Sequence, residues 1–231
     1  MRGSPVSGSS PWWRRLFGGS KAARSAAVIV AHPDDETLWA GGQILAHPRW
    51  DWFVASICRA SDKDRSPRFF KALERLDAIG AIADLDDGPD QHPLDTHMIQ
   101  ETVLRLLPQT HYDVILTHGP SGEYTRHRRH EELSRAVTEL WQSKRIAAKS
   151  LMLFAYEDGG GQYLPRARQD AHSRHKLPEP AFREKSLIIR QSYGFASDSW
   201  EARVTPRIEA FWCFQSPRQL GHWLLKTGGQ R

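Results

Sequence analysis

The stretch that decides the fold runs from Ala26 to Gly42 and reads AAVIVAHPDDETLWAGG. Its first part, Ala27–Ala31, is apolar and rich in β-branched residues, which is typical of a buried strand. A polar cluster from His32 to Glu36 follows directly, and the residues after it favour a helix, since proline and carboxylates suit a first helical turn. A histidine and three acids therefore lie where a strand ends and a helix begins, which is where ligands bind in open α/β sheets.

The rest of the chain alternates between strand and helix patterns. Such an alternation indicates parallel βαβ units, so we predict a single α/β domain with a mostly parallel sheet flanked by helices. Residues 158–180 look polar and loop-like, and Val204–Phe214 fits a strand or a helix equally well. Further strands are expected at Trp52–Cys58, Ala81–Leu85, Asp113–His118 and Leu151–Tyr156, and helices at 34–46, 67–80, about 99–107, His127–Trp141 and Ala181–Tyr193.

The helix after the second strand is predicted from its apolar positions. Phe70, Leu73, Leu76 and Ile79 recur at three-residue steps, and Gly80 follows as a stop signal. These four side chains are therefore expected to face the core.

Length and composition restrict the class of protein. The chain has 231 residues, 39% of them hydrophobic, and a formal net charge of +5. It has no apolar run near the ~20 residues that a membrane span needs. It also lacks the basic cluster with aromatic platforms that nucleic-acid binding requires, so no nucleic-acid partner is expected. Cys58 and Cys213 lie in apolar, strand-like contexts, and buried free thiols suit a reducing compartment, which predicts a cytoplasmic protein.

The ends of the chain differ from its middle. Residues 1–25 are rich in Gly, Ser, Pro and Arg without a periodic pattern, and we expect a disordered basic extension there. Its segment 12–17 has aromatic residues beside arginines, which is also seen at lipid interfaces. The folded domain is expected at 26–215 and a C-terminal tail at 216–231.

Two pairs of residues carry the candidate chemistry. His32 and Asp35 are three positions apart, and so are His127 and His130, which share one side of a helix. Each pair alone has an ordinary explanation, as a helix cap or a solvated helix face. Together they follow two buried parallel strands and should meet at one sheet edge, where two nitrogens and a carboxylate would leave a coordination position open, as in a catalytic zinc site.

These residues also carry a family resemblance. The run Ala31–Glu36, followed by Leu38 and Gly41–Gly42, resembles the first motif of the PIG-L/LmbE-like zinc-dependent N-deacetylases. The second motif of that family, a Gly-rich loop ending in His-x-Asp-His, is similar to Gly119–His130. The resemblance covers about 26–160, with a weaker similarity around Lys185. It implies a Rossmann-like domain that removes acetyl from an N-acetylated amino sugar or a similar small amide.

Matched position by position, the resemblance implies a role for each polar residue. His32, Asp35 and His130 would bind Zn²⁺, although Fe²⁺ suits the same ligands. Asp34 would be the general base that takes a proton from the attacking water. His127 would help to stabilise the oxyanion, and either His127 or the acid form of Asp34 would protonate the leaving amine.

The sequence departs from the family pattern at two points. Arg129 stands where the family has an acid between the two histidines, an acid that orients His127. Arg129 could turn outward, with a carboxylate from elsewhere in the acid's place. The Gly-rich loop is one residue longer, and its Tyr124 is a candidate for the oxyanion-assisting tyrosine. Glu36 is expected to support the site through hydrogen bonds.

Residues that follow the second and third strands are candidates for substrate binding. Arg59, Asp62, Arg65 and Arg68 come after the second strand, and Asp87 comes after the third. Carboxylates and arginines commonly hold sugar hydroxyls, although surface loops are polar in any case. From this set we select Arg59, Arg68 and Asp87.

The predicted function is that of a metal-dependent hydrolase that removes an acetyl group from an N-acetylated amino sugar or sugar conjugate. One alternative is a zinc amidase that acts on another acyl amide. A second is a non-catalytic sugar-binding relative, in which Arg129 marks lost activity. The presence of Asp34 beside the metal ligands argues against this last alternative, because binding alone needs neither a metal nor a base.

Overall fold

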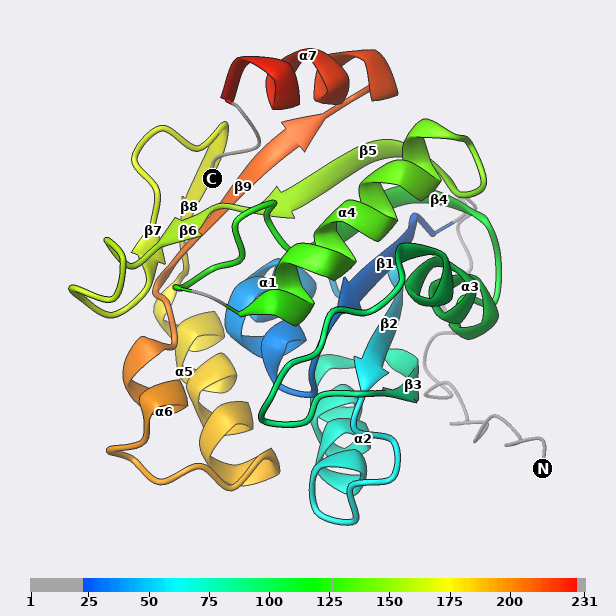
Figure 1. The fold of residues 1–231 in the computed structure, drawn as a ribbon. Helices are drawn as coiled ribbons and strands as arrows, with labels where there is room; N and C mark the ends of the chain where they lie inside the picture. The colour runs from blue at the N-terminus through cyan, green and yellow to red at the C-terminus, as the bar shows by residue number, and fades with distance from the viewer. Residues whose placement is uncertain (1–22, 126, 228–231) are drawn as a thin grey trace.

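The structure, a computed structural model, describes residues 23–125 and 127–227. In this part of the chain, a seven-stranded sheet runs in the order β3-β2-β1-β4-β5-β9-β8 (Figure 1). The first five of these strands are parallel, β9 runs antiparallel to β5, and β8 runs antiparallel to β9. The predicted α/β architecture is therefore confirmed. The strands are β1 (Ser25–Val30), β2 (Asp51–Cys58), β3 (Ile79–Leu85), β4 (His111–Thr117), β5 (Ala147–Phe154), β8 (Ser173–Lys176) and β9 (Ile208–Phe214).

Helices cover both faces of the sheet (Figure 1). Helices α1 (Asp35–Ala46), α2 (Arg65–Leu76) and α5 (Glu179–Leu187) pack together on one face. Helices α3 (Thr96–Leu106) and α4 (Arg128–Gln142) pack together on the other face. The smaller elements are the strand pair β6 (Tyr156–Glu157) and β7 (Arg166–Ala167), the π-helical turn η2 (Ile188–Ser192) that continues α5, and the helices α6 (Trp200–Val204) and α7 (Pro217–Thr227).

Strand β1 is the centre of the parallel sheet. Its residues Ala26–Val30 are fully buried, and Val28 pairs with Val54 of β2 on one side and with Leu116 of β4 on the other. Burial on both faces explains why the strand is a continuous apolar run. The next strand of the chain, β2, lies on one side of β1, while β4 lies on the other, so the order of the strands reverses here. The carboxyl ends of β1 and β4 therefore flank the position where open α/β sheets bind ligands.

Helix α2 differs from its prediction in boundaries and in its buried face. Phe70 and Ile79 are 38% and 59% exposed, whereas Phe69 is fully buried. The buried positions follow the i, i+3, i+4, i+7 spacing of a helix with 3.6 residues per turn, from which strict three-residue steps drift away. The helix ends at Leu76, and Gly80 lies inside β3, where a Cβ would come within 2.4 Å of the Val54 carbonyl oxygen.

The C-terminal part of the chain is more regular than the sequence indicated. The stretch expected to be loop-like contains β8, an edge strand whose Ser-Arg-His-Lys sequence has no apolar alternation. The ambiguous segment Val204–Phe214 forms strand β9 after the end of α6. Residues 217–227, within the segment assigned to a tail, form α7, which packs against α4 and β9.

The remaining expectations meet the structure in part. The extension expected at 1–25 lies almost wholly outside the described residues. Cys58 and Cys213 are free thiols, and Cys58 is buried. Among the helices of the described part, none combines the length and the apolar composition that a membrane crossing requires.

Candidate active site

The turn between β1 and α1 holds an unusual backbone conformation. Asp34 has a φ of 110°, which L-residues rarely adopt and which often marks a functional site. The buried Glu36 stabilises this conformation, because its Oε2 accepts a hydrogen bond from the Asp34 N–H at 3.0 Å. The other carboxylate oxygen accepts from Thr37 Oγ1 at 2.5 Å and from the Tyr193 hydroxyl at 2.8 Å. Burial raises the pKa of Glu36 to about 7, despite these bonds.

Three potential metal-binding atoms converge next to this turn. His32 Nδ1 lies 3.2 Å from Asp35 Oδ2 and 3.2 Å from His130 Nε2, and the last two atoms are 3.3 Å apart. Corners of a tetrahedron with bonds of about 2.0–2.1 Å lie about 3.3–3.4 Å apart, so the spacing fits a zinc ion. The second oxygen of Asp35 accepts a hydrogen bond from the Trp39 indole at 3.0 Å, which fixes the carboxylate.

The charges of these groups depend on one another. Burial disfavours the anion of Asp35, but His130 and His32 hold its pKa well below the usual range. Burial likewise disfavours the cation of His130, yet Asp35 and Glu123 raise its pKa to about 10. Such a field attracts positive charge, and a divalent cation would satisfy it in place of the histidine proton.

Glu123, which sequence reasoning missed, connects two buried histidines. Its Oε2 lies 2.6 Å from His130 Nδ1 and 2.7 Å from His118 Nδ1, and its Oε1 accepts a hydrogen bond from the Gly119 N–H at 3.0 Å. His118 Nε2 accepts the Ala31 N–H at 3.0 Å, so the ring carries its proton on Nδ1, toward the carboxylate. Despite burial, the two histidines lower the pKa of Glu123 to about 2. The bond to His130 leaves Nε2 free to face the candidate metal position.

His127 lies beside the same cluster. Its ring centroid is 4.5 Å from that of His32 and 4.2 Å from that of His130. Burial and the two neighbouring histidines lower the pKa of His127 to about 3. Its Nδ1 is buried without a hydrogen-bond partner among the described residues. An unpaired buried polar atom is costly, so this nitrogen is available for a ligand.

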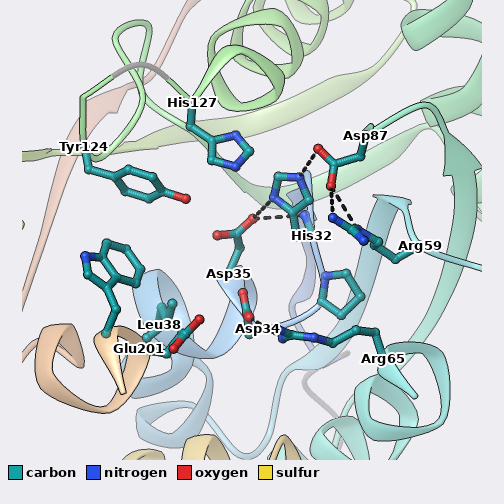
Figure 2. Close-up of a pocket in the computed structure, with 12 residues that line it drawn as sticks. His32, Asp34, Asp35, Leu38, Arg59, Arg65, Asp87, Tyr124, His127 and Glu201 are labelled. Atoms are coloured by element: carbon teal, nitrogen blue, oxygen red, sulfur yellow. Dashed lines mark hydrogen bonds and ion pairs between the residues drawn. The ribbon is translucent and has the colours of Figure 1, made fainter. Parts of the chain in front are cut away.

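Asp34 and Asp87 both face the pocket, each paired with an arginine (Figure 2). Arg65 Nη1 donates to Asp34 Oδ2 at 2.8 Å. Burial and the nearby Asp35 nevertheless raise the pKa of Asp34 well above its usual value. Asp87 Oδ2 accepts two hydrogen bonds from Arg59, at 2.6 and 2.9 Å, and its Oδ1 lies 3.2 Å from His32 Nε2.

Arg68 is placed elsewhere. Its guanidinium pairs with Asp64 and donates to the carbonyl of Tyr193, so it connects α2 to the end of η2 and does not line the pocket. Arg65, one helical turn earlier, occupies the position at the pocket. The two arginines are only three residues apart, and the sequence offered no signal to separate them.

A cavity of about 370 Å³ opens above these groups. Tyr124 lines it, and the centroid of its ring lies 6.3 Å from that of Trp39 and 4.8 Å from that of Trp200. Trp200 and Glu201, at the start of α6, line the cavity and were not predicted, because nothing local connects them with residues so distant in sequence. The lining residues are His32, Pro33, Asp34, Asp35, Leu38, Arg59, Arg65, Asp87, Tyr124, His127, Trp200 and Glu201.

Arg129 is fully buried and does not turn outward to solvent. Its guanidinium donates to the carbonyls of Asp86 and His92, in the loop between β3 and α3, and to the carboxylate of Glu132 in α4.

Fold and site together define a Rossmann-like α/β protein with a candidate metal site at the switch point of its sheet. A family model described as PIG-L, GlcNAc-PI de-N-acetylase, matches residues 27–141. This range contains both sides of the site, the β1–α1 turn and the β4–α4 connection. The chain belongs to the PIG-L family.

Individual relatives are distant. An uncharacterised protein of Acanthamoeba polyphaga mimivirus is 23% identical over 197 residues, covering 78% of this chain and 80% of that protein. The N,N'-diacetylchitobiose deacetylase of Pyrococcus horikoshii matches with a TM-score of 0.62 at 14% identity, over 84% of this chain and 85% of its own. The 4-carboxy-2-hydroxymuconate hydratase of Pseudomonas putida matches with a TM-score of 0.57 at 16% identity, over 82% and 95%. These structures support the fold, which serves more than one reaction.

Proposed function

We propose that the protein is a zinc-dependent hydrolase that removes the acetyl group from an N-acetylated amino sugar. The observation that carries the proposal is the tetrahedral spacing of His32 Nδ1, Asp35 Oδ2 and His130 Nε2, with the carboxylate of Asp34 facing the same cavity. Membership of the PIG-L family agrees with it. Fe²⁺ would suit the same ligands, so the metal itself is part of the proposal.

Zinc at such a site supplies two effects, a lower pKa for a water molecule and a polarised amide carbonyl. Asp34 accepts the proton of the attacking water, since its carboxylate faces the cavity with Arg65 as its partner. Asp34 then delivers this proton to the leaving amine, which must be protonated to depart. His127 and Tyr124 line the cavity with an imidazole and a phenol ring (Figure 2). There they would stabilise the charge that develops on the carbonyl oxygen.

The cavity suits a single neutral sugar ring. Its volume of about 370 Å³ is small for a ligand site, and Trp200 and Tyr124 provide aromatic surface at its wall. Arg59 and Arg65 are already paired with Asp87 and Asp34, so among the described lining residues no cation remains for a phosphate. We therefore propose that the substrate is an N-acetylated amino sugar without a charged group on its ring.

Two other functions are less well supported. An amidase for a longer acyl group would need more space than this cavity of about 370 Å³. A non-catalytic sugar-binding relative would not need Asp34 beside the metal ligands. Cytoplasmic location stays a proposal, supported by the free thiols of Cys58 and Cys213.

The experiment measures zinc content and acetate release from N-acetylglucosamine, N,N'-diacetylchitobiose and N-acetylglucosamine 6-phosphate. We expect one zinc per chain and acetate release from the two neutral sugars. Acetate release from N-acetylglucosamine 6-phosphate should be slower. Asp34→Asn should keep the zinc and lower kcat by about 10²–10⁴-fold, as expected for loss of a general base. The matched control is Asp64→Asn, an exposed acid paired with Arg68. Stoichiometric zinc without hydrolysis of any N-acetyl amide would refute the proposal.

A further inference from the structure

Arg129 is a costly residue in its position. It lies in the first turn of α4, where the helix dipole disfavours a cation, and its side chain is completely buried. Burying an arginine is rare unless its donors are paired. The neighbouring Arg128, by contrast, is exposed to solvent.

The guanidinium of Arg129 connects both ends of one loop. Its Nε donates to the carbonyl of Asp86 at 2.6 Å, and its Nη2 donates to the carbonyl of His92 at 2.8 Å. Its Nη1 donates to Glu132 Oε2 at 2.6 Å, and the other oxygen of Glu132 accepts the Leu94 N–H at 3.1 Å. Arg129 and Glu132 therefore fix segment 86–94 to the start of α4.

The loop 86–92 carries Asp87, which contacts a candidate zinc ligand. Asp87 Oδ1 lies at an ion-pair distance of 3.2 Å from His32 Nε2, the ring nitrogen opposite the one that faces the metal position, without an aligned hydrogen bond in the described residues (Figure 2). Gln91, in the same loop, donates to this oxygen at 2.8 Å. A carboxylate on the outer nitrogen of a metal-binding histidine fixes the ring orientation and increases its basicity.

We propose that Arg129 is a positioning residue that clamps the loop 86–92, so that Asp87 orients His32 for metal binding. This rests on the proposed function, because it takes His32 as a zinc ligand. In this chain Arg129 is therefore a support of the metal site and not a mark of lost activity. Its planar fork reaches two carbonyls and a carboxylate at once, which a lysine cannot do.

A double-mutant cycle tests the proposal in the full chain. The four proteins are the wild type, Arg129→Met, Asp87→Asn and the double variant, and the measurement is Zn²⁺ affinity of the metal-free protein by chelator competition. Each single variant should bind Zn²⁺ about 10-fold more weakly, at the low end of losses for such outer partners. If Arg129 acts through Asp87, the double variant should bind Zn²⁺ no more weakly than Asp87→Asn alone.

Control variants keep the test decisive. Arg128→Met should leave Zn²⁺ affinity unchanged, since it removes the same charge from the exposed neighbouring position. Should Arg129→Met not fold, as judged by thermal unfolding, Arg129→Lys replaces it and should show the same non-additivity at smaller amplitude. The role of Arg129 would be overturned if the double variant lost Zn²⁺ affinity by the product of the two single losses. It would also be overturned if either single variant kept the wild-type affinity. A wild-type chain that binds no Zn²⁺ would instead overturn the proposed function, and this inference with it.

Discussion

The β1–α1 turn contributes five consecutive residues to the site, His32–Glu36, whereas the β4–α4 connection depends on residues from several segments. In the turn, His32 and Asp35 face the metal position and Asp34 faces the cavity. Glu36 accepts a hydrogen bond from the Asp34 N–H. On the other side, His130 is hydrogen-bonded to Glu123. Arg129 is hydrogen-bonded to a loop that begins at Asp86, more than forty residues earlier. Local backbone geometry therefore organises one side, and tertiary packing organises the other.

The largest effect is expected when a candidate zinc ligand is removed from the β1–α1 turn. Asp35→Ala should weaken Zn²⁺ binding by about 10³-fold, because a binding free energy of about 10–16 kcal/mol is shared among few ligands. Asp170→Ala, at an exposed carboxylate paired with Arg168, is the control and should bind zinc normally. Chelator competition gives both affinities. A variant Asp35→Ala that retains the wild-type affinity would exclude the carboxylate as a ligand.

The β1–α1 turn and its helix also depend on distant residues, among them Lys185 and Glu209. Lys185 Nζ donates to Glu209 Oε1 at 2.7 Å, and the same carboxylate accepts the N–H groups of Gly42 and Gln43 in α1 at 2.7 and 2.8 Å. A Cβ on Gly42 would lie 2.9 Å from Glu209 Oε1 and 2.3 Å from Leu177, so the glycine allows this approach. Lys185→Met should lower the free energy of unfolding by about 3 kcal/mol, since it leaves a buried carboxylate without its partner cation. Urea denaturation measures the loss, and exposed Lys176→Met is the control.

Lys185 should also give a pH dependence of known sign. Burial lowers its pKa below the ordinary 10.5, although Glu209 opposes the shift. Between the folded-state value and 10.5 the unfolded chain binds more protons, so this residue makes the free energy of unfolding rise with pH in that window. The difference between wild type and Lys185→Met should therefore increase toward pH 10.5 in urea denaturation. A decrease would show that the folded protein binds the extra proton.

The sequence was informative where the chemistry is local. The apolar run of β1 and the acids of the first turn of α1 are adjacent, so both the strand end and the candidate ligands could be predicted. Edge strand β8 could not, because its polar side chains are exposed and its pairing with β9 is a tertiary event. Phe69 and Phe70 show a second limit of prediction from sequence. Either ring could face the core, and only the packing of α2 decides that Phe69 is the buried one.

The candidate site follows the same division. His127, His130 and Tyr124 were expected at this edge because they follow a buried strand, and their rings lie together at the candidate site. Glu123 lies between them in the same loop, yet nothing distinguishes a buried carboxylate from an exposed one before the loop folds back. Trp200 reaches the cavity only through the packing of the C-terminal segment.

A smaller loss of Zn²⁺ affinity is expected from a change at Glu123, in the β4–α4 connection. Glu123→Gln keeps the shape of the side chain but removes the charge that orients His130, so Zn²⁺ affinity should fall by about 10–100-fold. Glu131→Gln is the matched control, because Glu131 is an exposed acid next to His130 in α4. Competition with a chelator measures both variants. Equal affinities for the two variants would show that His130 does not depend on Glu123.

The smallest expected effect concerns the hydroxyl that holds Glu36. Tyr193→Phe removes one hydrogen bond to Glu36 Oε1 and should lower the free energy of unfolding by about 1 kcal/mol. Tyr163→Phe removes a hydrogen bond to Glu157 and should cost less, since Glu157 lies near the surface, where water replaces the bond. Denaturation in urea compares the two. Because Glu36 also holds the Asp34 backbone at its positive φ, Tyr193→Phe should lower kcat for acetate release as well, whereas Tyr163→Phe should not. A loss of stability without any loss of kcat would mean that Glu36 keeps the turn in place without its tyrosine.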